Sequence, residues 1–114
     1  MDALPDATRA ALAPYLDASE HVERFVAAVG CSLVLTDRRL AVVREGASYR
    51  PRSGVRSWTL DRSLSLHLAP ARRETARLVI ERTGRSASVF VAGEHVEEAR
   101  TLIAEIRSRT YADS

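Results

Sequence analysis

Residues 33–43 limit the fold of this chain more than any other stretch. Aliphatic residues flank the polar residues 36–39 on both sides. Aliphatic and β-branched runs of this kind are typical of strands, and an Asp at the junction favours a turn. The stretch therefore predicts a β-hairpin with one strand over residues 31–36 and the next over residues 39–44.

Further strands are predicted on both sides of this hairpin. Their spans are residues 21–29, 55–60, 63–68, 75–82 and 86–91. Between the third and fourth strands, residues 48–54 form either a short edge strand or a loop, because Pro51 and Gly54 disfavour a central strand. No helix separates consecutive strands, so a doubly wound parallel sheet is excluded.

One helix is predicted at each end of the chain. Residues 3–16 fit a short helix, which Asp2 or Asp6 can cap and which Pro14 keeps from being long. After Gly93 a second helix is expected, since apolar side chains recur there at spacings of three and four. These positions are Val96, Ala99, Ile103, Ile106 and Thr110.

The predicted fold class is α+β and mostly β. A bent antiparallel sheet or partly open barrel of about seven strands, with the last helix at an open end, buries every apolar stripe. The length of 114 residues fits one domain. We expect an N-terminal helix and connector over residues 1–20, the domain over residues 21–110 and a frayed tail over residues 111–114.

Positive charge is concentrated in the middle of the sequence. All 17 basic residues are Arg, and residues 38–85 hold twelve of them against four acids, a net charge of +8. The whole chain has a net charge of only +2. The basic middle is either a solvated surface, which we favour, or a surface that attracts an acidic partner.

Several sequence features indicate a cytoplasmic protein. Cys31 is the only cysteine, so no intrachain disulfide can form and a reducing compartment is expected. The acidic N-terminus lacks the basic and apolar regions of a signal peptide. No apolar run approaches the roughly 20 residues that a membrane helix needs.

No motif of catalysis or cofactor binding is present. The sequence has no nucleophile elbow, phosphate-binding glycine loop or HExxH motif. His21, His67 and His95 lack the spacing of metal ligands. We therefore predict no enzymatic activity, no metal and no cofactor.

The polar residues of the central hairpin are the first candidate site. Thr36, Asp37, Arg38 and Arg39 could form a recognition loop or could serve the fold. We favour the structural role, with Asp37 bonded to turn N–H groups and an Arg paired with it or with a neighbouring acid.

A second candidate site lies among the arginines that follow. Forked guanidinium groups bind phosphate and carboxylate groups, which would suit an anionic partner. The candidate residues are Arg50, Arg52, Arg56, Arg72 and Arg73. Tyr49 and Trp58 are candidate interface residues, although Trp58 fits the rim of a core better. Two aromatics without a known motif make nucleic acid a poor candidate.

The chain resembles the bacterial pleckstrin-homology (PH)-like domains over roughly residues 15–109. Residues 33–40 match the "vlTdrRl" hairpin signature of that family. Weaker matches are residues 16–22, which look like "L.pgE.v", residues 54–58, which look like "i..I.sv", and the final strand–turn–strand–helix order.

The resemblance implies a PH-like fold and a non-enzymatic binding module. We expect this module to mediate protein–protein interaction or self-association. The alternative is weak peripheral binding to anionic membrane lipid through the Arg-rich middle. In relatives that bind phosphoinositides, basic residues surround an extended loop between the first two strands. Here that loop is reduced to about Gly30, so specific phosphoinositide binding is not expected.

Overall fold

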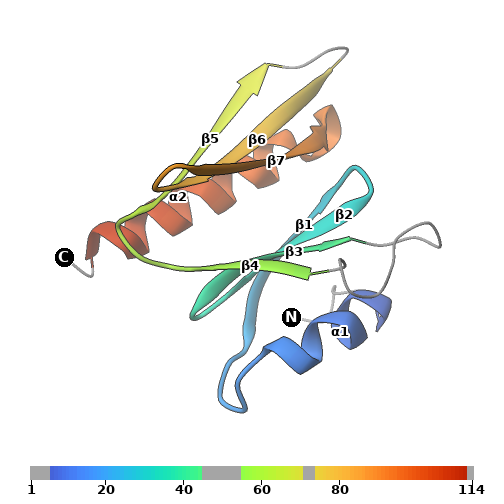
Figure 1. The fold of residues 1–114 in the computed structure, drawn as a ribbon. Helices are drawn as coiled ribbons and strands as arrows, with labels where there is room; N and C mark the ends of the chain where they lie inside the picture. The colour runs from blue at the N-terminus through green and yellow to red at the C-terminus, as the bar shows by residue number, and fades with distance from the viewer. Residues whose placement is uncertain (1–5, 45–54, 71–73, 113–114) are drawn as a thin grey trace. The chain divides into compact units, whose positions relative to one another are not determined.

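The computed structural model of the chain describes residues 6–44, 55–70 and 74–112. These residues form two helices and seven strands (Figure 1). The chain divides into two compact units, residues 1–58 and residues 59–114. One sheet has the strand order β1-β2-β3-β4, and the other has the order β5-β6-β7. In both sheets each strand therefore pairs with its neighbour in sequence.

The first unit consists of a helical segment followed by the four-stranded sheet. Its elements are α1 (Asp6–Leu12), a 3-10 turn (Ala13–Tyr15), β1 (Val22–Ala28), β2 (Cys31–Thr36), β3 (Arg39–Arg44) and β4 (Val55–Thr59). The β1–β2 and β2–β3 pairs are antiparallel. Two residues, Val29 and Gly30, connect β1 to β2. Gly30 has a φ of 73°, a left-handed conformation that glycine adopts without steric cost.

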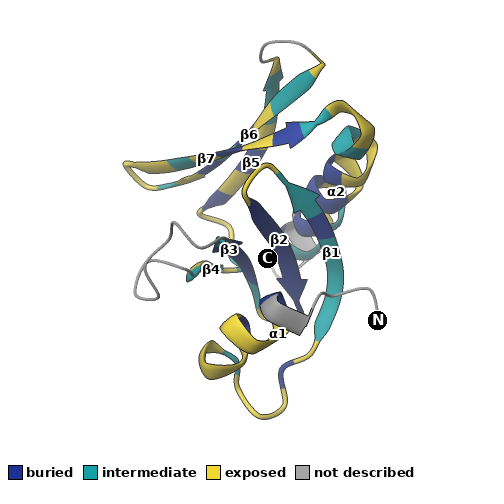
Figure 2. Cartoon of the chain, turned by 90° about the vertical axis from the view of Figure 1, so that its right-hand side faces the viewer, coloured by how far each residue is buried: buried dark blue, intermediate teal, exposed yellow. Residues whose placement is uncertain are grey.

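The core of the first unit lies between α1 and the sheet. Leu12 of α1 is buried in one cluster with Val34 of β2 and with Ala41 and Val43 of β3. Val34 and Ala41 are register partners, which places their side chains on the same face. All six residues of β2 are buried, and this strand is dark blue throughout Figure 2. The apolar run that predicted the hairpin is therefore the most buried part of this unit.

The second unit is a three-stranded meander followed by a helix. Its elements are β5 (Leu64–Pro70), β6 (Thr75–Arg82), β7 (Arg85–Ala92), a 3-10 turn (Gly93–His95) and α2 (Val96–Ala112). Both strand pairs are antiparallel. The helix contacts all three strands. Arg107 Nη2 also donates a hydrogen bond to the carbonyl oxygen of Leu66, at 3.1 Å.

One face of the second sheet and one face of α2 form the core of this unit. The strands contribute Leu64, Leu66, Leu78, Ile80, Val89 and Val91, and the helix contributes Ala99, Leu102, Ile103 and Ile106. Alternate strand residues such as Ser65, Glu81 and Ser88 are exposed. The period-two pattern of the strands and the three-and-four spacing of the helix therefore meet in one apolar layer.

The backbone comes unusually close to itself where α2 begins. A Cβ atom built on Gly93 would lie 2.5 Å from the carbonyl oxygen of Glu74. No side chain fits in that space, so a glycine is required. Glu74 itself has a φ of 57°, although it is not a glycine. This contact joins the start of β6 to the start of the helical segment.

The predicted fold class is confirmed: the part of the chain that the structure describes is mostly β, with seven strands, a short N-terminal helix and a long C-terminal helix. The strands form two sheets rather than one continuous sheet. The predicted bounds of β2, β3 and β6 agree with the structure. Residues 48–54, predicted as an edge strand or a loop, lie within the segment 45–54 outside the described residues.

Several predicted boundaries were wrong. The helix predicted over residues 3–16 ends at Leu12 within the described residues, and a separate 3-10 turn that contains Pro14 follows, because proline cannot donate the next helical hydrogen bond. β5 continues to Pro70, past its predicted end at Leu68, because an outer strand tolerates proline. A 3-10 turn precedes α2, and the helix continues to Ala112, two residues into the predicted tail.

We predict that Ile103→Ala lowers the free energy of unfolding by about 2–5 kcal/mol, because it removes buried methyl groups from the layer between α2 and the sheet. Urea denaturation followed by circular dichroism would measure this loss. Ser108→Ala, on the exposed side of the same helix, is the matched control and should change stability little. Equal stability of Ile103→Ala and the parent chain would contradict the assignment of this core.

Candidate functional site

A buried carboxylate connects the chain before β1 to the β2–β3 hairpin. The side chain of Glu20 is 0% exposed. Its Oε2 atom accepts hydrogen bonds from Thr36 Oγ1 and from Arg39 Nε, the latter at 2.8 Å. Its Oε1 atom accepts a bond from the backbone N–H of Asp17 at 3.2 Å. Both carboxylate oxygens are therefore bonded, as a buried charge requires.

The Thr36 hydroxyl organises the turn of the hairpin. Its oxygen accepts hydrogen bonds from the backbone N–H groups of Arg38 at 3.1 Å and Arg39 at 3.0 Å. Its hydrogen is donated to Glu20. One hydroxyl thus uses its single donor and both acceptor positions. A threonine at this point satisfies the turn and binds the buried acid at once.

These bonds control the ionisation of Glu20. Burial by itself would raise the pKa of the carboxyl group. The hydrogen bonds from Thr36, Asp17 and Arg39, together with the positive charge of Arg39, outweigh burial and hold the pKa of Glu20 below its ordinary value near 4.5. The group is therefore a carboxylate at neutral pH.

A second set of bonds surrounds the exposed end of the hairpin. Asp37 Oδ1 accepts a hydrogen bond from the backbone N–H of His21 at 3.1 Å, and this bond is the main reason that the pKa of Asp37 is lowered. Arg38 donates to Asp17 Oδ2 at 2.9 Å and to Ser19 Oγ at 2.6 Å. The polar side chains of residues 36–39 are therefore bonded to the segment before β1, which favours a structural role.

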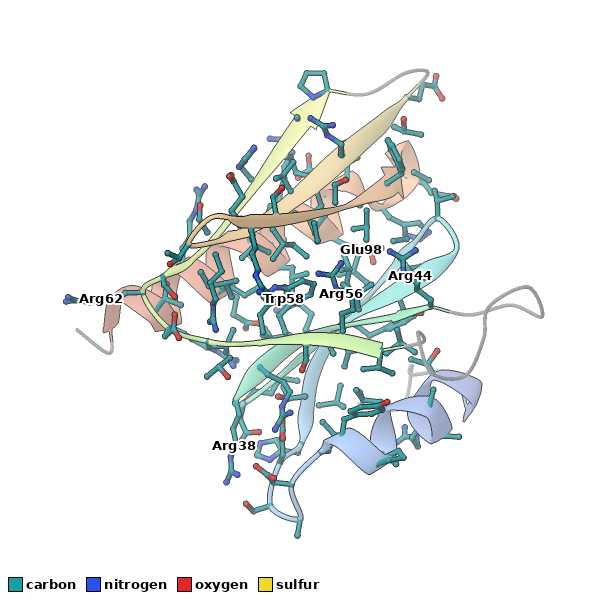
Figure 3. The ribbon with its side chains drawn as sticks, in the orientation of Figure 1. Arg38, Arg44, Arg56, Trp58, Arg62 and Glu98 are labelled. Carbon is teal, nitrogen blue, oxygen red and sulfur yellow. The ribbon has the colours of Figure 1, made fainter. Side chains whose placement is uncertain are left out.

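The structure describes only part of the Arg-rich candidate site. Arg50, Arg52, Arg72, Arg73 and Tyr49 lie outside the described residues. Arg56 is exposed on β4, and its guanidinium carbon lies 5.4 Å from the centre of the Trp58 ring. Both side chains project from the same side of the strand (Figure 3). The guanidinium therefore covers part of the half-buried Trp58 ring in a cation–π contact.

A wide pocket opens in the second unit where the sheet and α2 begin to separate. Its volume is about 940 Å³. Leu68, Ala76 and Val96 give it an apolar wall, and Glu74, Glu94 and Arg100 are among its polar lining residues. Arg100 Nε lies 3.6 Å from Glu97 on the same helix. The pocket can hold an apolar group, but its described residues show no paired acid and base.

The outer strands of the two sheets differ in how they are protected against further pairing. Proteins commonly block outer strands with charges, proline or bulges. β1 carries Glu23 and Arg24 and has a register shift at its start, and the short β4 carries Arg56. β5 ends in Pro70. Three of the four outer strands therefore carry such features.

β7 is the exception among the outer strands. Its charged residue, Arg85, stands at its first position, and its eight residues pair with β6 without a register shift. The exposed residues that follow on one face are Ser86, Ser88 and Phe90. Phe90 is 49% exposed, and its register partner on β6 is the exposed Arg77. β7 therefore presents an outer edge that is uncharged after Arg85 and lies beside an exposed aromatic ring.

The comparison with solved structures identifies the fold. The chain is similar to the crystal structure of a pleckstrin homology domain from Shewanella amazonensis SB2B, with a TM-score of 0.60. The similarity covers 89% of this chain and 96% of that one, at 17% sequence identity. This chain has a PH-like fold. No protein-family model matches the sequence, and no curated protein matches it.

Three observations on this PH-like chain concern basic side chains, metals and membranes. The β1–β2 turn consists of Val29 and Gly30, so it carries no basic side chain. Within the described residues, no cluster of three or more metal-binding side chains occurs. The helices of the described part are also too short or too polar to cross a membrane.

Sequence reasoning missed the two most informative parts of this PH-like chain. Glu20 was considered only as the E of the "L.pgE.v" match. Thr36 lies 16 residues further along the chain, so no local sequence pattern indicates their contact. Phe90 was assigned to a strand, but its exposure depends on the face of the sheet that it occupies, which it shares with the exposed Arg77 of β6. The small, uncharged residues 86–88 are the sequence pattern that could have indicated an outer strand without features that block further pairing.

We predict that Thr36→Val destabilises the fold by about 1–3 kcal/mol. Valine keeps the shape of threonine but leaves two backbone N–H groups and the Glu20 carboxylate without the hydroxyl. Thr36→Ser retains the hydroxyl and is the control. Chemical denaturation of both variants would test this, and an equal loss in both would assign the effect to packing instead.

The lowered pKa of Glu20 predicts a pH-dependent contribution to stability. A carboxyl group whose folded pKa lies below its unfolded pKa stabilises the fold above the unfolded value. This contribution is lost as the pH falls below about 4.5 and through the folded pKa. The difference in unfolding free energy between the parent chain and Glu20→Gln should therefore be largest at neutral pH and shrink below pH 4.5.

Denaturation curves measured from about pH 7 to about pH 3 would follow this difference, because that range spans the ordinary pKa of a glutamate. Glu97→Gln, which changes a side chain that is 90% exposed, is the matched control. A difference for Glu20→Gln that stays constant across the range would contradict the proposed role of its charge.

Proposed function

We propose that this chain is a non-enzymatic PH-like module that binds a protein partner by strand addition to β7. The observation that carries the proposal is the outer edge of β7, which is uncharged over residues 86–92 and lies beside the exposed ring of Phe90. The PH-like fold supports a binding role, because this fold is typically that of a binding module. A cytoplasmic location is part of the proposal and is supported by the single, buried Cys31.

Strand addition uses groups that β7 already presents. An outer strand has a row of backbone N–H and C=O groups directed away from its sheet, and an extended segment of a partner can pair with them. The main chain supplies affinity in this mode, and side chains beside the edge supply specificity. Phe90 would supply apolar contact area, and Arg77 beside it would select for acceptor groups.

Peripheral binding to anionic membrane is the alternative, and it has less support. Of its five candidate arginines the structure describes Arg56, whose guanidinium already lies over the ring of Trp58. The short β1–β2 turn also lacks the basic residues that phosphoinositide-binding relatives place there. Any attraction to acidic lipid would then depend on total charge and weaken in salt.

A selection of random linear peptides on the full chain would test the proposal. We expect peptides that bind the parent chain, and we expect Ser88→Lys to weaken their binding roughly tenfold or more by placing a charge beside the β7 edge. Ser65→Lys makes the same change at an exposed serine of β5, the other outer strand of this sheet, and should leave binding unchanged.

Three results would overturn the proposal. They are a selection on the monomeric chain that yields no binding peptide, equal effects of the two lysine variants, and salt-resistant sedimentation with anionic vesicles that Arg56→Ala abolishes. The last result would favour the membrane alternative.

A further inference from the structure

We propose that the partner strand is β7 of a second copy of this chain, paired antiparallel about a two-fold axis. This inference rests on the proposed strand addition at β7 and names its partner. Two copies would then share a six-stranded sheet, with the two β7 strands at its centre. Such an interface is isologous, since each copy contributes the same residues.

The composition of β7 suits pairing with itself. Residues 86–92 contain no charged residue, no proline and no glycine. Uncharged segments of six or seven residues with strand-forming side chains are those that readily pair with identical segments. The segment is already held extended along its full length by β6, so little backbone entropy remains to be lost on pairing.

Charge at the two ends of β7 selects the antiparallel direction. Arg85 stands exposed at its beginning, and Glu94, whose side chain is 78% exposed, follows its end. Antiparallel pairing brings Arg85 of each copy close to Glu94 of the other copy, and it does so twice. Parallel pairing would instead place like charges together at both ends.

One register keeps buried and exposed residues on the same faces in both copies and also brings Arg85 close to Glu94. With Val89 opposite Val89 of the second copy, Phe90 lies opposite Ser88, and the two Phe90 rings are diagonal neighbours within reach of each other. Arg85 then lies opposite Gly93, directly beside Glu94. Buried residues stay on the helix side of the sheet, and exposed residues stay on the other side.

The helices leave room for this arrangement. Each α2 contacts all three strands of its own sheet, so the helices of two copies are separated by about three strand spacings, or about 14 Å. Packed helices need only about 8–10 Å between their axes. The shared sheet therefore places the two helices side by side without collision.

Sedimentation velocity and light scattering of the full chain across a concentration series would test the inference. We expect a reversible dimer that Ser88→Lys converts to monomer and that Ser65→Lys leaves intact. Arg85→Glu and Glu94→Arg should each raise the dimer dissociation constant on the order of tenfold, because each makes two like-charge contacts. The double variant should restore the dimer, and an equal mixture of the two single variants should form a heterodimer.

Rescue by the double variant separates this inference from a folding defect, since neither charge change touches the buried layer. A parent chain that stays monomeric while its selected peptides still lose binding in Ser88→Lys would overturn the second copy as partner and leave strand addition standing. A dimer that Ser88→Lys does not affect, or one that Ser65→Lys disrupts, would place the interface elsewhere and overturn both proposals.

Discussion

The buried carboxylate of Glu20 is the interaction on which the first unit depends. It joins the segment before β1 to a hairpin turn 16 residues later through Thr36, and it holds Arg39 at the start of β3. Without these bonds a charge and several backbone donors would be buried without partners. The polar residues 36–39 of the hairpin therefore stabilise the fold, and the proposed binding surface lies in the second unit.

Sequence patterns predicted those parts of the fold that local chemistry decides. Aliphatic runs fixed β2 and β3 because their side chains must leave water, and Gly30 marked a turn that needs a positive φ. The length of β5 could not be read in this way, because its partner β6 decides how far it pairs. Glu20 and Phe90 gained their roles from distant neighbours, which a single sequence does not reveal.

The strands β2 and β7 differ in how strongly burial constrains their residues. β2 is buried at every residue, whereas β7 alternates buried and exposed residues and stands at the outside of its sheet. A buried strand is constrained at each position, while an outer strand is free to change its exposed residues. A charged residue at position 86 or 88 would cost the fold little. The small, uncharged Ser86 and Ser88 therefore say more about function than the buried residues of β2 do.

The order of the strands also bears on how the chain reaches its fold. Every strand that the structure describes pairs with a sequence neighbour, and two-residue turns join β1 to β2, β2 to β3 and β6 to β7. Closing such short loops costs little chain entropy, so these hairpins can form early. The bond from Arg107 to Leu66 spans 41 residues, and it becomes available only when α2 reaches the finished meander. The topology thus favours a sequence of events in which the sheet provides the surface on which the last helix is ordered.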